Sequence, residues 1–312
     1  MTRHRIASLL PSATEIVCAL GLGEQLVGRS HECDFPPGLE SLPVLTRSRV
    51  RVDGLSGETD RDVRRLLEDA LAVYEVDVEA LERADPSAVV TQDLCDVCAV
   101  SLSDVRDALQ QLGRGDVALI NLHPTRLNEV WDDVRRVGQA LGHSERGERV
   151  AAELAGRIAA LTERTAQLPR ASVLTIEWLD PVMVGGTWMP ELVTAAGGEA
   201  LVTEPGQHAP TLTRGDLAGL RPDLVLIKPC GFPLAQTRRE LSAFLEGLSG
   251  LEWPALNTGR VYVADGNAYF NRPGPRLVES AEILAACLHP EACADLAERH
   301  AGAFERVQVP RP

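Results

Sequence analysis

The chain has 312 residues, of which 45% are hydrophobic, and a formal net charge of −14 from 31 basic and 45 acidic residues. This length favours two α/β lobes. The acidic balance, without a basic stripe that could neutralise phosphates, argues against nucleic acid as a partner. The sequence has no run of the roughly 18 apolar residues that a membrane-spanning helix needs, so we expect no membrane insertion.

The first segment is expected to fold as a strand and a helix rather than to act as an export signal. Residues 1–5 are basic and residues 6–22 are fairly apolar, but the stretch 11–15 interrupts them and no small-residue cleavage site follows. Seven cysteines, an odd number, fit a reducing compartment better than a disulfide framework. Both observations predict a cytoplasmic protein.

Strands and helices are predicted to alternate along the chain, which is typical of parallel sheets. Ser12 is expected to cap the first helix, with Glu15 completing a capping box. We predict strands at residues 5–9, 26–29, 88–91, 117–121, 172–176, 224–227 and 261–263. We predict helices at residues 13–20, 53–69, 78–83, 103–112, 127–141, 145–167, 191–196, 213–220, 238–248 and 277–288.

The predicted helix at 145–167 is long enough to join two lobes. About 23 residues at a rise of 1.5 Å each span roughly 35 Å, the width of a small domain. We therefore expect an N-terminal α/β lobe at residues 1–143, a connecting helix at 144–168 and a C-terminal α/β lobe at 169–312. In both lobes polar loops follow the predicted strands, which is where ligands bind in open α/β sheets.

Several segments resemble the periplasmic-binding-protein-like receptors for iron chelates and vitamin B12. The resemblance covers almost the whole chain, through Ile6–Glu15, Ala19–Gly21, Leu26–Ser30, Asp85–Val90, Ala195–Gly198 and Arg221–Val225. It implies the class III substrate-binding architecture, in which one long helix joins two Rossmann-like lobes with parallel sheets. It also implies a binding protein rather than an enzyme.

Within this family the chain resembles the cobalamin-binding proteins. Asp34–Pro37 matches a segment that places an aromatic on one wall of the corrin cleft, and Tyr269–Arg276 matches the segment on the opposite wall. Exported relatives dock onto a permease through one acidic residue on each lobe. Glu79 stands at the first of these positions, whereas Asn271 occupies the second. The implied partners are a small-molecule corrinoid and either a transporter or a corrinoid-handling enzyme.

A corrin is a broad, partly apolar disc with amides around its rim, so its site needs aromatic surfaces and hydrogen-bonding groups. The candidate ligand-binding residues are Ser12, His31, Glu32, Phe35, Gln92, Asp93, Glu177, Trp178, Trp188, Tyr269, Phe270 and Arg272. Each aromatic either touches the ligand or fills the core of its lobe, and Phe35 and Tyr269 are the leading candidates for contact.

The polar candidates also have alternative roles. His31 either ligates cobalt, bonds the corrin rim, or is a solvated or capping loop residue. The carboxylates of the strand-end loops either accept from rim amides or form ion pairs with arginine. The carboxylates are Glu32, Asp34, Glu177 and Asp180, and the arginines are Arg29, Arg272 and Arg276.

A pair of cysteines adds a different possibility. Cys95 and Cys98 have the CxxC spacing of half a zinc site or of a redox pair, although a single pair also fits ordinary loop thiols. The candidate metal ligands are Cys33, Cys95, Cys98 and His31, with Cys230 as a further thiol. Together with His31–Cys33, the CxxC pair resembles a cytosolic subgroup that lacks a signal peptide.

Three functions compete at this point. The leading hypothesis is a protein that holds cobalamin or a related corrinoid in a cleft between two lobes for sequestration or transfer. The second is a metal- or thiol-dependent enzyme built on Cys33, Cys95 and Cys98. The third is a transport component for a ferric chelate or haem, which as an anion would call for clustered arginine.

Overall fold

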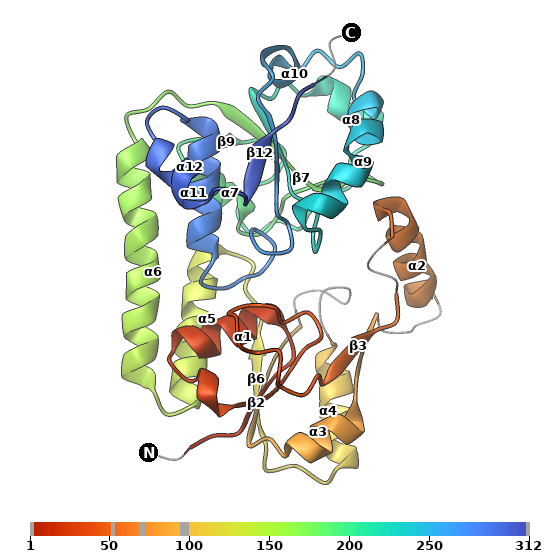
Figure 1. Cartoon of the computed structure of the whole chain (residues 1–312), viewed down its shortest axis with the longest axis vertical. Helices are drawn as coiled ribbons and strands as arrows, with labels where there is room; N and C mark the ends of the chain where they lie inside the picture. Colours follow the sequence, from red (N-terminus) through yellow and green to blue (C-terminus); the bar gives the residue numbers. More distant parts are fainter. Residues whose placement is uncertain (1–2, 51–53, 69–72, 94–99, 310–312) are drawn as a thin grey trace. The chain divides into compact units, whose positions relative to one another are not determined.

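The computed structural model describes residues 3–50, 54–68, 73–93 and 100–309, and their contacts divide the chain into two compact units. Unit 1 comprises Met1–Val52, Arg61–Pro124 and Asn128–Ala155, and unit 2 comprises Asp53–Asp60, Thr125–Leu127 and Gly156–Pro312. Each unit contains its own sheet with helices beside it (Figure 1). The predicted α/β class is confirmed, whereas the lobe boundaries placed at residues 143 and 168 stay a prediction.

Unit 1 contains a four-stranded parallel sheet in the order β2–β1–β5–β6. The strands are β1 (Ile6–Ser8), β2 (Leu26–Arg29), β5 (Ala88–Gln92) and β6 (Ala118–Leu122). Every residue of β1 and β5 is buried, as expected for parallel strands that are covered on both faces. Because the strands run in one direction, the loops that follow them emerge at one edge, which we call the carboxyl edge of unit 1.

Helices and a second, smaller sheet complete unit 1. The helices that contribute residues to it are α1 (Pro11–Ala19), η1 (Gly23–Gln25), α2 (Ser56–Glu68), α3 (Val78–Ala84), α4 (Leu102–Gln111), α5 (Leu127–Ala140) and α6 (Ser144–Thr165). β3 (Thr46–Ser48) and β4 (Tyr74–Val76) pair antiparallel. The sequence analysis does not predict these two strands, because three residues carry too little alternation to recognise.

The prediction that Ser12 caps the first helix is wrong. α1 has Pro11 at its first position and Leu10 as its N-cap, without a side-chain hydrogen bond to the cap. Proline lacks an N–H and its fixed φ suits the first helical position, so the helix begins without a capping side chain. Ser12 lies inside the first turn, where it is buried.

The sheet of unit 2 is parallel at its centre. β10 (Leu224–Ile227) lies between β7 (Ser172–Trp178) and β11 (Val261–Ala264), and all three are parallel. Three short strands extend this sheet: β12 (Phe304–Arg306) antiparallel to β11, β8 (Met183–Val184) antiparallel to β7, and β9 (Glu199–Ala200) parallel to β7. The predicted parallel sheet is therefore confirmed for the central strands, and the loops after β7, β10 and β11 form the carboxyl edge of unit 2.

The helices of unit 2 follow the expected order, with additions. They are α7 (Met189–Ala195), α8 (Arg214–Gly219), α9 (Leu234–Gly247), α10 (Pro254–Thr258), α11 (Leu277–Leu288), α12 (Ala294–Arg299) and the second part of α6. Trp253 is fully buried, and its indole N–H donates to the carbonyl of Leu217 at 2.9 Å. α11 is predicted as the last element, but α12 and β12 follow it.

Glu282 on α11 joins three helical segments of unit 2. His300 Nε2 lies 2.7 Å from Glu282 Oε2, and Arg157 Nη2 on α6 lies 3.0 Å from Oε1. Arg299 Nη1 at the end of α12 lies 3.4 Å from Oε2. Burial opposes ionisation of this carboxyl, but the hydrogen bonds from His300 and Arg157 outweigh it and lower the pKa of Glu282 to about 2.

We expect Glu282→Gln to lower the free energy of unfolding at pH 7 by about 3 kcal/mol, because the buried His300 and the half-buried Arg157 lose their carboxylate. The folded pKa is below the unfolded value of 4.5. The contribution is therefore present above pH 4.5 and is lost as the pH falls towards about 2. Urea unfolding at pH 7 and at pH 3 measures the gap between wild type and variant. A gap of equal size at both pH values would contradict this assignment.

Candidate functional site

The carboxyl edge of unit 1 carries a row of buried polar atoms that find no hydrogen-bond partner among the described residues. Ser12 follows β1, His31 follows β2, Thr91 and Gln92 end β5, and Asn121 lies in β6 opposite Thr91. The atoms concerned are Ser12 Oγ, His31 Nε2, Thr91 Oγ1, Gln92 Oε1 and Asn121 Oδ1. We call these five residues the polar row.

The polar row is unusual on energetic grounds. A buried polar atom without a partner costs about 1–3 kcal/mol, and native proteins contain few of them. Each of four neighbouring strands, or the segment that follows it, contributes at least one such atom at the same edge. Ligands bind at this edge in open α/β sheets. The arrangement therefore points to a bound molecule, or ordered water in its absence, as the missing partner.

Asp93 orients part of the row. It follows β5, and its Oδ1 lies 2.7 Å from His123 Nδ1. Burial opposes ionisation, but hydrogen bonds from the side chains of Asn121 and His123 outweigh it and lower the pKa of Asp93. An ionised carboxylate only accepts, so the amide NH₂ of Asn121 donates to Asp93 and its oxygen is left as an acceptor in the polar row.

The loop after β2 holds the other polar candidates of unit 1. Tyr74 donates its hydroxyl hydrogen to Glu32 Oε1 at 2.9 Å, and its ring lies 5.3 Å from the ring of His31. The guanidinium of Arg29 donates to the backbone carbonyls of Leu39, Ser30 and Cys33. Phe35 is 39% exposed, and its contact with a ligand stays a prediction.

At the carboxyl edge of unit 2, a buried lysine ties three segments together. Lys228, which follows β10, is the only lysine of the chain and has no exposed surface. Its Nζ lies 2.6 Å from Glu177 Oε2 in β7 and 2.8 Å from Asn271 Oδ1 in the loop after β11. The Asn271 amide in turn donates to the carbonyls of Lys228 and Gly266. Glu177 is therefore paired with lysine, not with an arginine, and Asn271 braces the loop.

The loop after β11 is held in one conformation by several hydrogen bonds. Asp265 accepts from the backbone N–H groups of Asn267 and Ala268. The indole of Trp188 donates to the carbonyl of Phe270 at 2.7 Å, and Ser280 accepts from the Phe270 N–H. A Cβ at Gly266 would lie 2.0 Å from the carbonyl oxygen of Pro229, so this close approach requires glycine.

The aromatic candidates of unit 2 differ in how deeply they are buried. Trp188 and Phe270 are 5% and 1% exposed, so both rings pack inside unit 2 and support the loop. Tyr269 is half-buried between Arg276, whose guanidinium carbon lies 5.6 Å from the ring centre, and the ring of His300. Trp178 is half-buried and packs edge-on against Phe232. Arg272, which is buried, donates to Asn267 Oδ1.

The structure gives no metal centre among the residues that it describes. No group of three or more His, Cys, Asp or Glu side chains in this part of the chain is arranged to hold an ion. Cys33 is buried and accepts a hydrogen bond from Thr14. Cys95 and Cys98 lie outside the described residues, so the CxxC pair stays a prediction.

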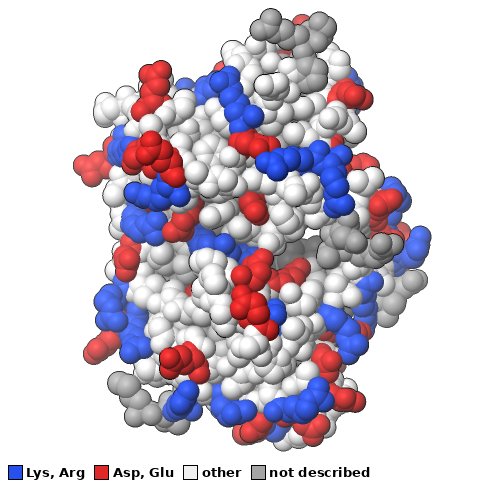
Figure 2. Space-filling model, in the orientation of Figure 1, with Lys and Arg blue, Asp and Glu red and all other residues white. Residues whose placement is uncertain are grey.

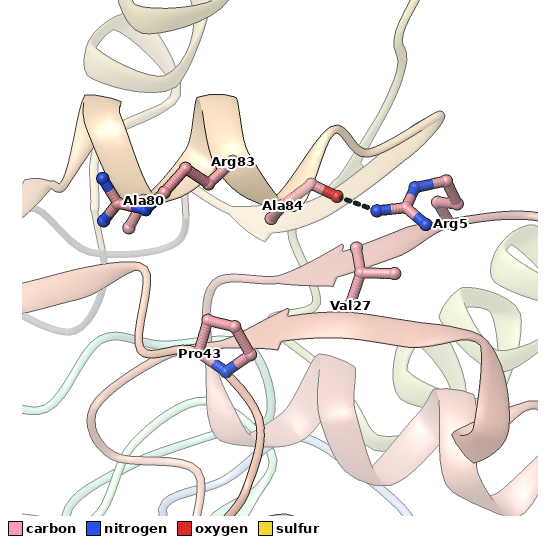
Figure 3. Close-up of a pocket in the computed structure, with 6 residues that line it drawn as sticks. All are labelled: Arg5, Val27, Pro43, Ala80, Arg83 and Ala84. Atoms are coloured by element: carbon pink, nitrogen blue, oxygen red, sulfur yellow. Dashed lines mark hydrogen bonds between the residues drawn. The ribbon is translucent and has the colours of Figure 1, made fainter.

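One cavity of unit 1 lies away from the carboxyl edge of its sheet. It has a volume of about 440 Å³ and is lined by Arg5, Val27, Pro43, Ala80, Arg83 and Ala84 (Figure 3). Arg5 immediately precedes β1, which places it at the amino end of that strand, and its Nη2 donates to the carbonyl of Ala84. The cavity therefore belongs to the opposite end of the sheet from the polar row.

The surface charge and the helices of the described residues can be compared with what nucleic-acid binding and membrane insertion require. On the face drawn in Figure 2, acidic and basic side chains are interspersed, and the described residues there form no continuous basic stripe. Within the described ranges, no helix combines the length and the apolar character that crossing a bilayer requires.

Comparison with known proteins assigns the chain to a family. A family model described as periplasmic binding protein matches residues 6–268. The chain belongs to this family. A vitamin B12-binding protein of Photorhabdus laumondii is 22% identical over 282 residues, which cover 90% of this chain and 86% of the relative.

Solved structures of the family share the fold. The periplasmic vitamin B12-binding protein BtuF of Vibrio cholerae has a TM-score of 0.65 and 18% identity, covering 92% of this chain and 97% of that one. The haem-binding protein RhuT of Roseiflexus sp. RS-1, in its apo form, has a TM-score of 0.68 and 23% identity, covering 93% and 100%. The two-lobed α/β architecture predicted from the sequence is thereby confirmed.

The family also decides two further predictions. Its members are substrate-binding proteins rather than enzymes, so the prediction that this chain is not an enzyme is confirmed. The predicted cytoplasmic localisation is wrong, because the family and its solved relatives are periplasmic binding proteins. The apolar segment at 6–22 contains β1 and α1, and neither that fact nor a count of cysteines determines the compartment.

We expect Lys228→Met to lower the free energy of unfolding by about 3 kcal/mol, because Glu177 and Asn271 lose a buried cation. Glu177→Gln should also destabilise the protein. Because the two residues share one interaction, the double variant should cost clearly less than the sum of the single variants. Urea unfolding of the four proteins measures this coupling, and additive costs would show that Lys228 is not stabilised by Glu177.

Proposed function

We propose that this chain binds a corrinoid of the cobalamin type and holds it for sequestration or delivery. Its relatives named vitamin B12-binding protein match 90% of its length at 21–22% identity. The family is shared by proteins for corrinoids, haem and iron chelates, so the choice among these ligands depends on the chemistry of the site.

The observation that carries this choice is the neutrality of the polar row. Gln92 Oε1 and Asn121 Oδ1 are amide oxygens, and Ser12 and Thr91 present hydroxyl groups. Such atoms match the primary amides on the rim of a corrin, which donate and accept hydrogen bonds without carrying charge.

A haem would call for different groups. Its propionates are anionic and are bound best by arginine or lysine. Lys228, the only lysine, is neutralised by Glu177 inside unit 2, and Arg272 is buried with a hydrogen bond to Asn267. Haem nevertheless stays the second candidate, because the haem-binding RhuT structure has a TM-score of 0.68 with this chain.

The proposed partner is a membrane transporter of the kind that substrate-binding proteins serve. Glu79, the acidic residue that matches the first docking position of exported relatives, has a side chain that is 87% exposed on α3. The second docking position is occupied by Asn271, which is engaged with Lys228. A transporter would therefore have to recognise unit 2 through other residues.

Isothermal titration calorimetry of the purified protein with cyanocobalamin tests the proposed function, and we expect a dissociation constant of micromolar or below. Gln92→Met removes one acceptor of the polar row at nearly constant volume and should weaken binding about tenfold, the equivalent of roughly 1.4 kcal/mol. Gln110→Met, the same change at an exposed position of α4, is the matched control and should leave affinity unchanged. Haemin bound more tightly than the corrinoid, or no corrinoid binding at all, would refute the proposal.

A further inference from the structure

His31 is the one member of the polar row whose unpartnered atom is a nitrogen. Thr46 Oγ1 accepts from the backbone N–H of His31 at 3.1 Å and donates to Ser30 Oγ at 3.0 Å. A threonine hydroxyl has a single hydrogen, which this bond to Ser30 uses. The 2.8 Å contact between His31 Nδ1 and Thr46 Oγ1 is therefore an N–H donated by the imidazole.

This assignment fixes the state of the other ring nitrogen. With the hydrogen on Nδ1, Nε2 of the neutral ring carries a lone pair, and that atom is buried without a partner among the described residues. Burial lowers the pKa of His31, a hydrogen bond with the backbone of Thr46 opposes this, and the charge of Arg29 lowers the pKa further. The ring is therefore neutral at pH 7, with its lone pair available.

The small sheet of unit 1 holds the ring in place. Thr46 begins β3 and Tyr74 begins β4, and the two strands are paired antiparallel. Tyr74 packs against the imidazole at 5.3 Å with the ring planes tilted by 41°, and it is itself fixed through its hydrogen bond to Glu32. The residues around His31 thus set its tautomer and its orientation together.

We propose that His31 Nε2 is a nitrogen ligand to the metal ion at the centre of the bound tetrapyrrole, which for a corrinoid is cobalt. A histidine that binds a metal through one nitrogen characteristically donates its other N–H to an oxygen, which fixes the tautomer and the ring orientation. Thr46 supplies that oxygen as a positioning residue. The inference rests on the proposed function and adds to it a direct bond between the protein and its cargo.

The bond forms by ligand exchange. Aquacobalamin carries an exchangeable water on cobalt, so the cobalt–oxygen bond breaks, water leaves and a cobalt–nitrogen bond forms, without any change in the oxidation state of cobalt. Cyanocobalamin holds at the same axial position a cyanide that exchanges poorly, and it is therefore the matched probe that cannot respond by exchange at that position.

The experiment titrates both corrinoids with the purified full chain and records the absorption spectrum and the affinity. With aquacobalamin we expect a shift of the corrin bands on binding, as the axial donor changes from oxygen to nitrogen. His31→Gln should abolish this shift and weaken the binding of aquacobalamin at least tenfold more than it weakens the binding of cyanocobalamin. His143→Gln, a histidine elsewhere in unit 1, should behave as wild type.

A second variant separates positioning from folding. Thr46→Val keeps the shape of the side chain but removes the acceptor of the Nδ1 hydrogen, so the shift should persist with aquacobalamin bound more weakly. Corrinoid binding by the wild type without any spectral shift would overturn the ligation and leave the proposed function intact. An equal loss of both corrinoids in His31→Gln would show a role in rim contact or folding and would also overturn it. Failure of the wild type to bind either corrinoid would refute the proposed function itself.

Discussion

Parallel strand pairing is the constraint from which the candidate site follows. β1 pairs with β2 on one side and with β5 on the other, and β6 continues the sheet in the same direction. Every loop that follows these strands is consequently delivered to one edge. The interior of the sheet is apolar on both faces, so polar side chains can gather only where the strands end. The polar row is the result, and its partly buried position is what makes its unpaired atoms costly in the absence of a ligand.

The two carboxyl edges differ in whether their polar groups are hydrogen-bonded to one another. In unit 2 the polar groups satisfy one another: Lys228 neutralises Glu177 and engages Asn271, and Trp188 and Ser280 hold the backbone of Phe270. Among the aromatic side chains of this edge, Trp188 and Phe270 are buried, whereas Tyr269 keeps part of its surface exposed. In unit 1 each corresponding side chain is oriented by one hydrogen bond and keeps another polar atom without a partner among the described residues. Asp93 orients Asn121 in this way, and Thr46 orients His31. The polar groups at the edge of unit 2 are therefore largely satisfied within the protein, whereas those of unit 1 can still form hydrogen bonds with a ligand.

The order of the elements could be predicted from the sequence because the central strands are short apolar runs between turn signals. β2, β10 and α11 have the predicted bounds, since buried runs and helical periodicity are local properties. The candidate site is only partly local. Gln92, Asp93 and His31 could be found by the rule that ligands lie beyond strand ends, but Thr91 and Asn121 lie within strands and look like core residues. The partners of Lys228 are 51 and 43 residues away in sequence, and no pattern in a single chain connects them.

The unpaired atoms of unit 1 also bear on what binding does to the protein. At about 1–3 kcal/mol each, a few unsatisfied polar groups cost an amount comparable with a fair share of a domain's net stability. A ligand that pairs with them removes this cost only in the folded state, and so it stabilises the fold by mass action as well as occupying the site. Orientation of His31 and Asn121 before binding further limits the entropy lost on association. The cost in the free protein and the gain on binding thus have one cause. Polar groups are fixed at the end of a sheet, and the chain itself does not supply their hydrogen-bond partner.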